Sequence, residues 1–175
     1  MTEEIKKQLP FLKNGVSQIA FVVKDLDEAV RCYYEVFGIG PWQFYTYEKP
    51  LVKEMSYHGK PANHSNRLAL SYFGTSRIEL IEVNEGESVY QDHIKKHGYG
   101  VQHLGFLVED MSEALKQAKE AGFEMIQDGS GFGLDGDGHY AYLDSEEKFG
   151  VMIELIERPK RRLSPEKVYP PVAKE

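Results

Sequence analysis

Four polar residues lie within short apolar, strand-like stretches of this sequence: Gln18, Glu79, His103 and Glu154. A carboxylate inside an apolar strand is costly unless it is paired or bound to a metal ion. Amide and carboxylate oxygens with one imidazole nitrogen suit a borderline-to-hard divalent ion that keeps open positions for water or substrate. A solvated sheet face would explain either glutamate alone, so a metal site requires that the fold bring all four residues together.

An internal repeat indicates that the fold does so. Val16–Ala29 matches Val101–Ala114 at an offset of 85 residues. The five letters Ile-Glu-Leu-Ile-Glu occur at both Ile78–Glu82 and Ile153–Glu157, at an offset of 75. Two matches in the same order at similar offsets are unlikely to arise by chance, so the chain is predicted to contain two copies of one module.

Each copy predicts a strand, a helix and then further strands. Asp25 and Asp110, each followed three residues later by a glutamate, predict helix starts, and Gly38 and Gly122 predict helix ends. The later strand-like segments are 43–47, 67–73, 77–83, 123–127, 139–143 and 151–157. The predicted fold class is α+β, with two paired βαβββ modules forming a curved mixed sheet with a concave metal site.

The predicted organisation is a single domain made of two modules, a joint and two terminal extensions. Its segments are an N-terminal extension (1–15), a first module (16–83), a connecting segment (84–100), a second module (101–157) and a C-terminal tail (158–175). A short helix is predicted over Ser88–His97 in the connecting segment. The basic cluster Arg158–Arg162 is predicted to be a solvated tail rather than a binding patch.

Strand alternation predicts that the four polar residues share one face of the sheet. Gln18 and His103 occupy matching positions in the first strands, on the face turned away from the helices. Glu79 and Glu154 occupy matching positions in the last strands. They lie on the same face, because the apolar residues beside them face the helices. If a pseudo-twofold axis relates the modules, all four surround that axis on one concave surface and are the predicted metal ligands.

Composition excludes several classes of function. The net charge of −7 argues against general nucleic-acid binding, and no segment approaches the roughly 20 apolar residues of a membrane-spanning helix. The start of the chain has no apolar core typical of a secretory signal. The single cysteine, Cys32, excludes an intrachain disulfide and is expected to lie in the core. We expect a cytoplasmic protein that binds a small-molecule substrate, and neither nucleic acid nor membrane.

Several residues near the predicted sheet are further candidates for substrate contact. Four aromatic residues are expected either to line the mouth of a pocket or to lie in the core: Trp42, Phe44, Tyr45 and Tyr47. The glycine-rich segment Gly129–Gly138 is predicted to be a flexible loop that could act as a lid. His139 and Tyr140 follow this loop and are candidates to touch substrate.

Three segments, Gln18–Ala29, Gly98–Val108 and Gly150–Leu155, resemble methylmalonyl-CoA epimerase-like members of the vicinal oxygen chelate superfamily. The resemblance covers about 16–157. It implies a divalent metal ion (Zn, Co, Ni or Mn) held by the four polar residues named above, and a homodimer. The epimerases usually have His at the first ligand position, so Gln18 resembles zinc-dependent glyoxalase I instead.

The resemblance implies a metal-dependent enzyme that abstracts a proton next to a metal-polarised carbonyl, through an enolate or enediolate. Glu154 and Glu79 are the candidate bases, with Glu154 preferred. The first interpretation is an isomerase or epimerase acting on an acyl thioester or oxo compound. The alternatives are a glyoxalase I-type lactoylglutathione lyase and a non-catalytic drug- or ligand-binding protein of the bleomycin-resistance type. Those binders usually lack the metal ligands, so the full ligand set favours catalysis.

Overall fold

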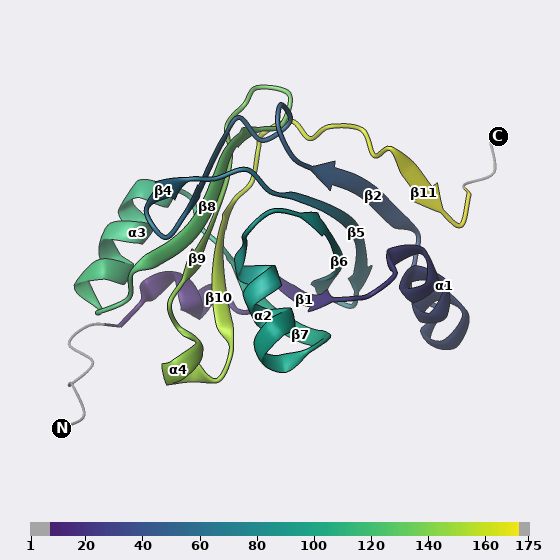
Figure 1. The fold of residues 1–175 in the computed structure, drawn as a ribbon, viewed down its shortest axis with the longest axis horizontal. Coiled ribbons are helices and arrows are strands. Elements are labelled where there is room, and N and C mark those ends of the chain that lie inside the picture. The colour runs from purple at the N-terminus through teal and green to yellow at the C-terminus, as the bar shows by residue number, and fades with distance from the viewer. Residues whose placement is uncertain (1–7, 172–175) are drawn as a thin grey trace.

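A computed structural model describes residues 8–171 as an α+β fold built on one curled, 11-stranded mixed sheet (Figure 1). The order of strands across the sheet is β11-β2-β5-β6-β1-β7-β10-β9-β8-β3-β4. In chain order, the elements are η1 (a 3₁₀ helix, Pro10–Asn14), β1 (Gln18–Val22), α1 (Leu26–Phe37), β2 (Trp42–Tyr47), β3 (Glu54–Tyr57), β4 (Lys60–Pro61), β5 (Ser65–Phe73), β6 (Ser76–Glu85), α2 (Val89–His97), β7 (Gly100–Leu107), α3 (Met111–Glu120), β8 (Met125–Phe132), β9 (Gly138–Leu143), α4 (Glu146–Phe149), β10 (Met152–Glu157) and β11 (Lys167–Tyr169).

The sheet contains two βαβββ units, which confirms the predicted fold class. In each unit the first strand runs parallel to the last, as β1 does with β6 and β7 does with β10. The two first strands, β1 and β7, pair antiparallel at the centre and join the units into one sheet. In this register Gln18 lies opposite Gly105, and Ala20 lies opposite His103.

Three short strands, none predicted from the sequence, extend the outer edges of the units. The β3–β4 hairpin leaves the first unit and pairs through β3 with β8 of the second unit. The last strand, β11, returns to pair with β2 of the first unit (Figure 1). Each unit thus receives an edge strand from outside its own βαβββ motif. These short additions cover backbone groups of β2 and β8 that would otherwise be unpaired.

Three clusters of buried side chains stabilise the fold. One packs α1 against the sheet and includes Ile19, Phe21 and Leu80, and another packs α3 against it and includes Phe106 and Leu155. These are the helix-facing positions that strand alternation predicted. The third cluster fills the opposite, concave face with residues of both units. The concave face is therefore largely a packed core, and a functional cavity occupies only part of it.

The helices α1 and α3 begin at matched pairs of acidic residues. Asp25 and Asp110 accept hydrogen bonds from the backbone N–H groups of Glu28 and Glu113, at 2.8 and 2.9 Å, which confirms the predicted N-caps. A second pair of caps was not predicted. Glu82 accepts from the N–H of Leu26 at 2.7 Å, and Glu157 accepts from that of Met111 at 3.0 Å. The final glutamate of each Ile-Glu-Leu-Ile-Glu repeat therefore caps the helix of its own unit.

Two local predictions were wrong. Cys32 is exposed, because α1 turns Leu26 and Val30 to the sheet and Cys32 lies on another side of the helix. Only half of the glycine-rich segment Gly129–Gly138 is a loop, since β8 continues to Phe132 and residues 133–137 alone connect it to β9. A Cβ atom at Gly129 or Gly138 would collide with the rings of Tyr140 and Phe132, respectively. These glycines therefore make room for aromatic packing.

The described part of the C-terminal segment is not the solvated tail that the sequence predicted. After β10 it crosses back over the sheet to β2, where the N–H of Glu166 donates to the carbonyl of Phe44 at 2.9 Å. The carboxylate of Glu166 accepts from the N–H of Thr46 at 2.7 Å. Arg161 pairs with Asp135 in the β8–β9 connection. The segment is thus attached to the β8–β9 connection through Arg161 and to β2 through Glu166.

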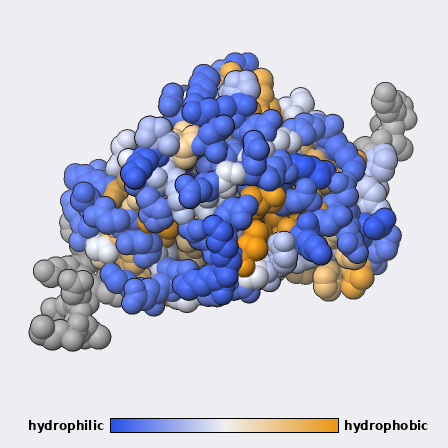
Figure 2. Space-filling view, in the orientation of Figure 1, coloured by the Kyte–Doolittle hydropathy of each residue, from blue (hydrophilic) through white to orange (hydrophobic). Residues whose placement is uncertain are grey.

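Most of the surface shown in Figure 2 is hydrophilic, with hydrophobic residues in a patch near the centre of the view and in another at the lower right, by α1. Val36 and Phe37 at the end of this helix are 73% and 63% exposed. No helix within residues 8–171 is both long and apolar enough to cross a membrane.

The Glu157 cap yields a prediction about stability. Glu157→Ala removes the acceptor for the N–H of Met111 and should lower the free energy of unfolding by about 1–2 kcal/mol, measured by urea denaturation. Glu157→Gln keeps an acceptor oxygen and should recover most of that loss. Equal stabilities of wild type and Glu157→Ala would contradict the assignment.

Candidate metal centre

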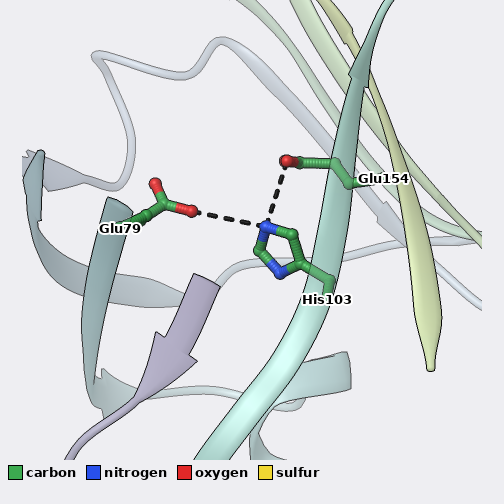
Figure 3. Close-up of side chains that lie close together, drawn as sticks. All are labelled: Glu79, His103 and Glu154. Carbon is green, nitrogen blue, oxygen red and sulfur yellow. Dashed lines mark ion pairs between the residues drawn. The ribbon is translucent and has the colours of Figure 1, made fainter. Parts of the chain in front are cut away.

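Glu79 on β6, His103 on β7 and Glu154 on β10 point toward one another at the centre of the sheet (Figure 3). The Nε2 atom of His103 lies 3.4 Å from Oε2 of Glu79 and 3.1 Å from Oε2 of Glu154. Each residue offers a ligand atom, and these atoms lie within 4.8 Å of one another. All three side chains are buried. The structure therefore places three of the predicted ligands close enough together to share one ion.

Gln18 on β1 completes the predicted set of four, but its amide faces the site through nitrogen. Its Nε2 group lies 2.7 Å from Oε2 of Glu79 and 3.2 Å from Oε2 of Glu154, while its Oε1 accepts from Nε of Arg77 at 2.8 Å. To bind an ion through Oε1 the amide must turn over, and Arg77 would then lose its acceptor. Gln18 as a metal ligand stays a prediction.

The strands create room for the site by placing small residues between the ligands. Gly105 follows His103 on the same face of β7, and Ala20 is its repeat-matched counterpart on β1. A Cβ atom at Gly105 would lie 2.9 Å from Cβ of Gln18 and 3.1 Å from Oε2 of Glu154. Both distances are shorter than ordinary van der Waals contact, so a side chain at this position would displace the predicted ligands.

A second set of hydrogen bonds orients the ligands. Tyr142, opposite Glu154 in the β9–β10 pairing, donates to its Oε1 at 2.9 Å, and the hydroxyls of Tyr142 and Tyr90 are 2.6 Å apart. The Nδ1 atom of His103 lies 2.5 Å from Oε1 of Gln102, which leaves Nε2 directed at the carboxylates. Such contacts fix the ring orientation and tautomer of a metal-binding histidine.

Burial and the two carboxylates control the protonation states in the centre. Burial lowers the pKa of His103, but Glu154 and Glu79 outweigh this effect and raise that pKa to about 9. Burial, followed by the charge of Glu154, raises the pKa of Tyr142 far above its ordinary value, so its phenol remains a hydrogen-bond donor. The two carboxylates thus favour a positive charge between them.

This donor set fits a divalent ion. Two carboxylate oxygens and one imidazole nitrogen converge in a buried place, where uncompensated negative charge is costly. An ion would take over the compensating role that protonated His103 otherwise has, so binding requires His103 to release its proton.

A cavity of about 70 Å³ lies against the centre on the concave side. Its lining contains Gln18, Tyr45, Tyr47, Leu70, Arg77, Glu79, Phe132, Gly133, Tyr140, Glu154, Ile156, Arg158, Pro159, Arg162 and Leu163. Of the aromatic candidates, Tyr45, Tyr47 and Tyr140 line this cavity, whereas Trp42 and Phe44 pack in the core beneath α1. His139 pairs instead with Asp128, at 2.9 Å.

Four residues at the cavity or the metal centre were not predicted to lie there from the sequence: Arg77, Arg158, Arg162 and Tyr142. Strand alternation carried a signal for the first two, since Arg77 is two residues before Glu79 and Arg158 is four residues after Glu154. Arg162 was recognised only as part of a basic cluster that was predicted to be solvated. Its position at the cavity and that of Tyr142 depend on the path of the C-terminal segment and on strand pairing, which no sequence pattern identified.

The chain belongs to the Glyoxalase/Bleomycin resistance protein/Dioxygenase superfamily, whose family model matches residues 17–142. It is 25% identical over 144 residues to the uncharacterized protein YqjC of Bacillus subtilis, covering 82% of this chain and 92% of that protein.

Two solved epimerases share the fold. The methylmalonyl-CoA epimerase of Mycobacterium tuberculosis has 21% identity and a TM-score of 0.57, over 83% of this chain and 89% of that one. A Streptomyces coelicolor methylmalonyl-CoA epimerase variant, solved in complex with 2-nitronate-propionyl-CoA, has 21% identity and a TM-score of 0.57, over 81% and 95% of the two chains. At these identities the likeness concerns the fold alone.

The raised pKa of His103 predicts how the stability of metal-free protein depends on pH. The folded state binds this proton more tightly than the unfolded chain, so the stabilisation is complete below about pH 6.5 and is lost as the pH rises through about 9. Melting temperatures of chelator-treated protein should fall across this window relative to those of His103→Gln. Parallel pH curves for the two proteins would contradict the prediction.

Proposed function

We propose that this protein is a metal-dependent isomerase or epimerase that moves a proton at the carbon next to a carbonyl group. The observation that carries the proposal is the convergence of Glu79, His103 and Glu154 beside a cavity. A bound divalent ion (Zn, Co, Ni or Mn) would supply a Lewis acid that polarises the carbonyl and lowers the barrier to C–H ionisation. Neutral His103 would hold the ion, and one carboxylate would carry the proton.

The contacts of the two glutamates distinguish them as bases. Glu154 uses both oxygens, Oε1 toward Tyr142 and Oε2 toward His103, whereas the contacts of Glu79 with Gln18 and His103 use Oε2 alone. A carboxylate held through one oxygen can rotate toward substrate at lower cost. The contacts therefore favour Glu79 as the base, over the Glu154 that the sequence analysis preferred. Tyr142 would keep Glu154 in position throughout the reaction.

The surroundings of the centre suit proton transfer. Tyr47, Phe132 and Ile156 give part of the cavity apolar walls, and electrostatic interactions are stronger beside such walls than in open water. The fold shared with methylmalonyl-CoA epimerases supports an acyl thioester or a small oxo compound as substrate. On the basis of the same family resemblance, we also propose that the protein is a cytoplasmic homodimer.

Gln18 favours a second candidate function. Gln18 is the first of the four predicted ligands along the chain. With Glu79, His103 and Glu154 it gives the ligand types that the resemblance to zinc-dependent glyoxalase I implies. A lactoylglutathione lyase would use the same proton abstraction on a hemithioacetal. The non-catalytic binding protein is less well supported, since the three converging ligands would then have no role in its binding.

Metal analysis tests the site. Wild type should bind about one equivalent of Zn, Co, Ni or Mn, measured by elemental analysis after dialysis. His103→Ala and Glu154→Gln should bind at least about 100-fold more weakly, because even indirect partners of ligands contribute 10–100-fold. Glu85→Gln, an exposed position at the end of β6, is the matched control. Equal metal content in wild type and both site variants would overturn the metal centre.

Proton exchange tests the chemistry. Metal-loaded wild type in deuterated water should exchange the α-proton of methylmalonyl-CoA, or the corresponding proton of the hemithioacetal of methylglyoxal and glutathione, followed by NMR. Glu79→Gln should slow exchange by about 10²–10⁴-fold while it retains some metal. If Glu79→Gln exchanges the proton as fast as wild type, Glu79 is not the base. An absence of exchange on both substrates would contradict the proposed reactions.

A further inference from the structure

Three arginines lie along the cavity that leads to the metal centre. Arg77 comes from β6, and Arg158 and Arg162 come from the segment that follows β10. Burial lowers the pKa of Arg158, and the nearby charges of Arg77 and Arg162 lower it further. Three cationic groups therefore lie close together, and their mutual repulsion disfavours this arrangement unless a negative charge compensates it.

Within residues 8–171, none of these three guanidinium groups forms an ion pair with a carboxylate. The side chain of Arg77 donates to the neutral amide of Gln18, and the Nε group of Arg158 is buried without a hydrogen-bond partner. Two other arginines are paired with carboxylates, Arg67 with Asp27 and Arg161 with Asp135. A buried donor without an acceptor is destabilising, so the Nε group of Arg158 favours an acceptor supplied by a bound molecule.

The C-terminal segment holds two of these arginines in place. Arg161, between Arg158 and Arg162, pairs with Asp135, and its carbonyl accepts from the N–H of Leu134 at 3.0 Å. The segment then reaches β2 through Glu166. Arg158 and Arg162 are thus presented to the cavity by a stretch of chain attached on both sides, in the way that a built binding site requires.

We propose that Arg77, Arg158 and Arg162 form an oxyanion-binding subsite for a carboxylate or phosphate group of a small molecule whose other end reaches Glu79, His103 and Glu154. Guanidinium groups bind such oxyanions in a bidentate manner, with charge-assisted hydrogen bonds. The anion-binding role of the arginines is independent of the proposed function. Only the statement that the other end of the molecule reacts at the metal centre rests on it. The subsite favours an acidic small molecule as the substrate, because a neutral one would leave buried Arg77 and half-buried Arg158 without a compensating charge.

The test measures anion binding to chelator-treated protein by isothermal titration calorimetry, so that no metal ion contributes. The probes are malonate, inorganic phosphate and uncharged malonamide. Wild type should bind at least one of the two anions and not malonamide, which also shows whether the subsite prefers carboxylate or phosphate. Arg158→Ala combined with Arg162→Ala should weaken anion binding about tenfold or more, and higher salt should weaken wild-type binding.

Lys160→Ala is the matched control, because it removes one exposed positive charge from the same segment outside the cavity and should leave affinity unchanged. If the double alanine variant does not fold, Arg158→Gln and Arg162→Gln replace it, with folding checked by circular dichroism. Unaltered binding in the arginine variants, or an equal loss in Lys160→Ala, would overturn the subsite. Anion binding without metal binding would contradict the proposed function and leave the subsite intact.

Discussion

Glu79 and Glu154 place two carboxylates, 7% and 5% exposed, at the centre of one curled sheet. Charges so little hydrated must be compensated locally, and the surrounding structure provides the compensation. His103 lies between them, Gln18 donates to both, and Tyr142 donates to the free oxygen of Glu154. Gly105 and Ala20 keep the space between the strands open for these side chains. The same arrangement that stabilises the folded protein is thus the one that could hold a divalent ion.

The two glutamates of each Ile-Glu-Leu-Ile-Glu repeat have separate roles. Glu79 and Glu154 face the concave side, while Glu82 and Glu157 cap the first residues of α1 and α3. The last strand of a unit therefore positions a site residue and anchors the helix that covers the other face of the sheet. This coupling links the geometry of the centre to helix packing, and it gives a physical reason for the identical letters in both copies.

The C-terminal segment changes the character of the site. A concave sheet alone would leave the centre open, but Arg158 and Arg162 line the cavity, and β11 attaches the segment to β2. The resulting cavity has apolar and aromatic walls, two carboxylates at one place and three guanidinium groups along it. Such a distribution of charge suits the proposed substrate, with a polar carbonyl at one end and an anionic group at the other.

The sequence alone determined the repeat, the two βαβββ units and the face on which Gln18, Glu79, His103 and Glu154 lie, because strand alternation and helix caps are local properties of a few neighbouring residues. Only the tertiary structure decided what surrounds them. The antiparallel register of β1 and β7, the amide orientation of Gln18 set by Arg77, the Tyr142 contact and the return of Arg158 and Arg162 all join residues distant in sequence. Cys32, expected in the core and found exposed, shows the same limit, since the buried side of a helix depends on how it packs.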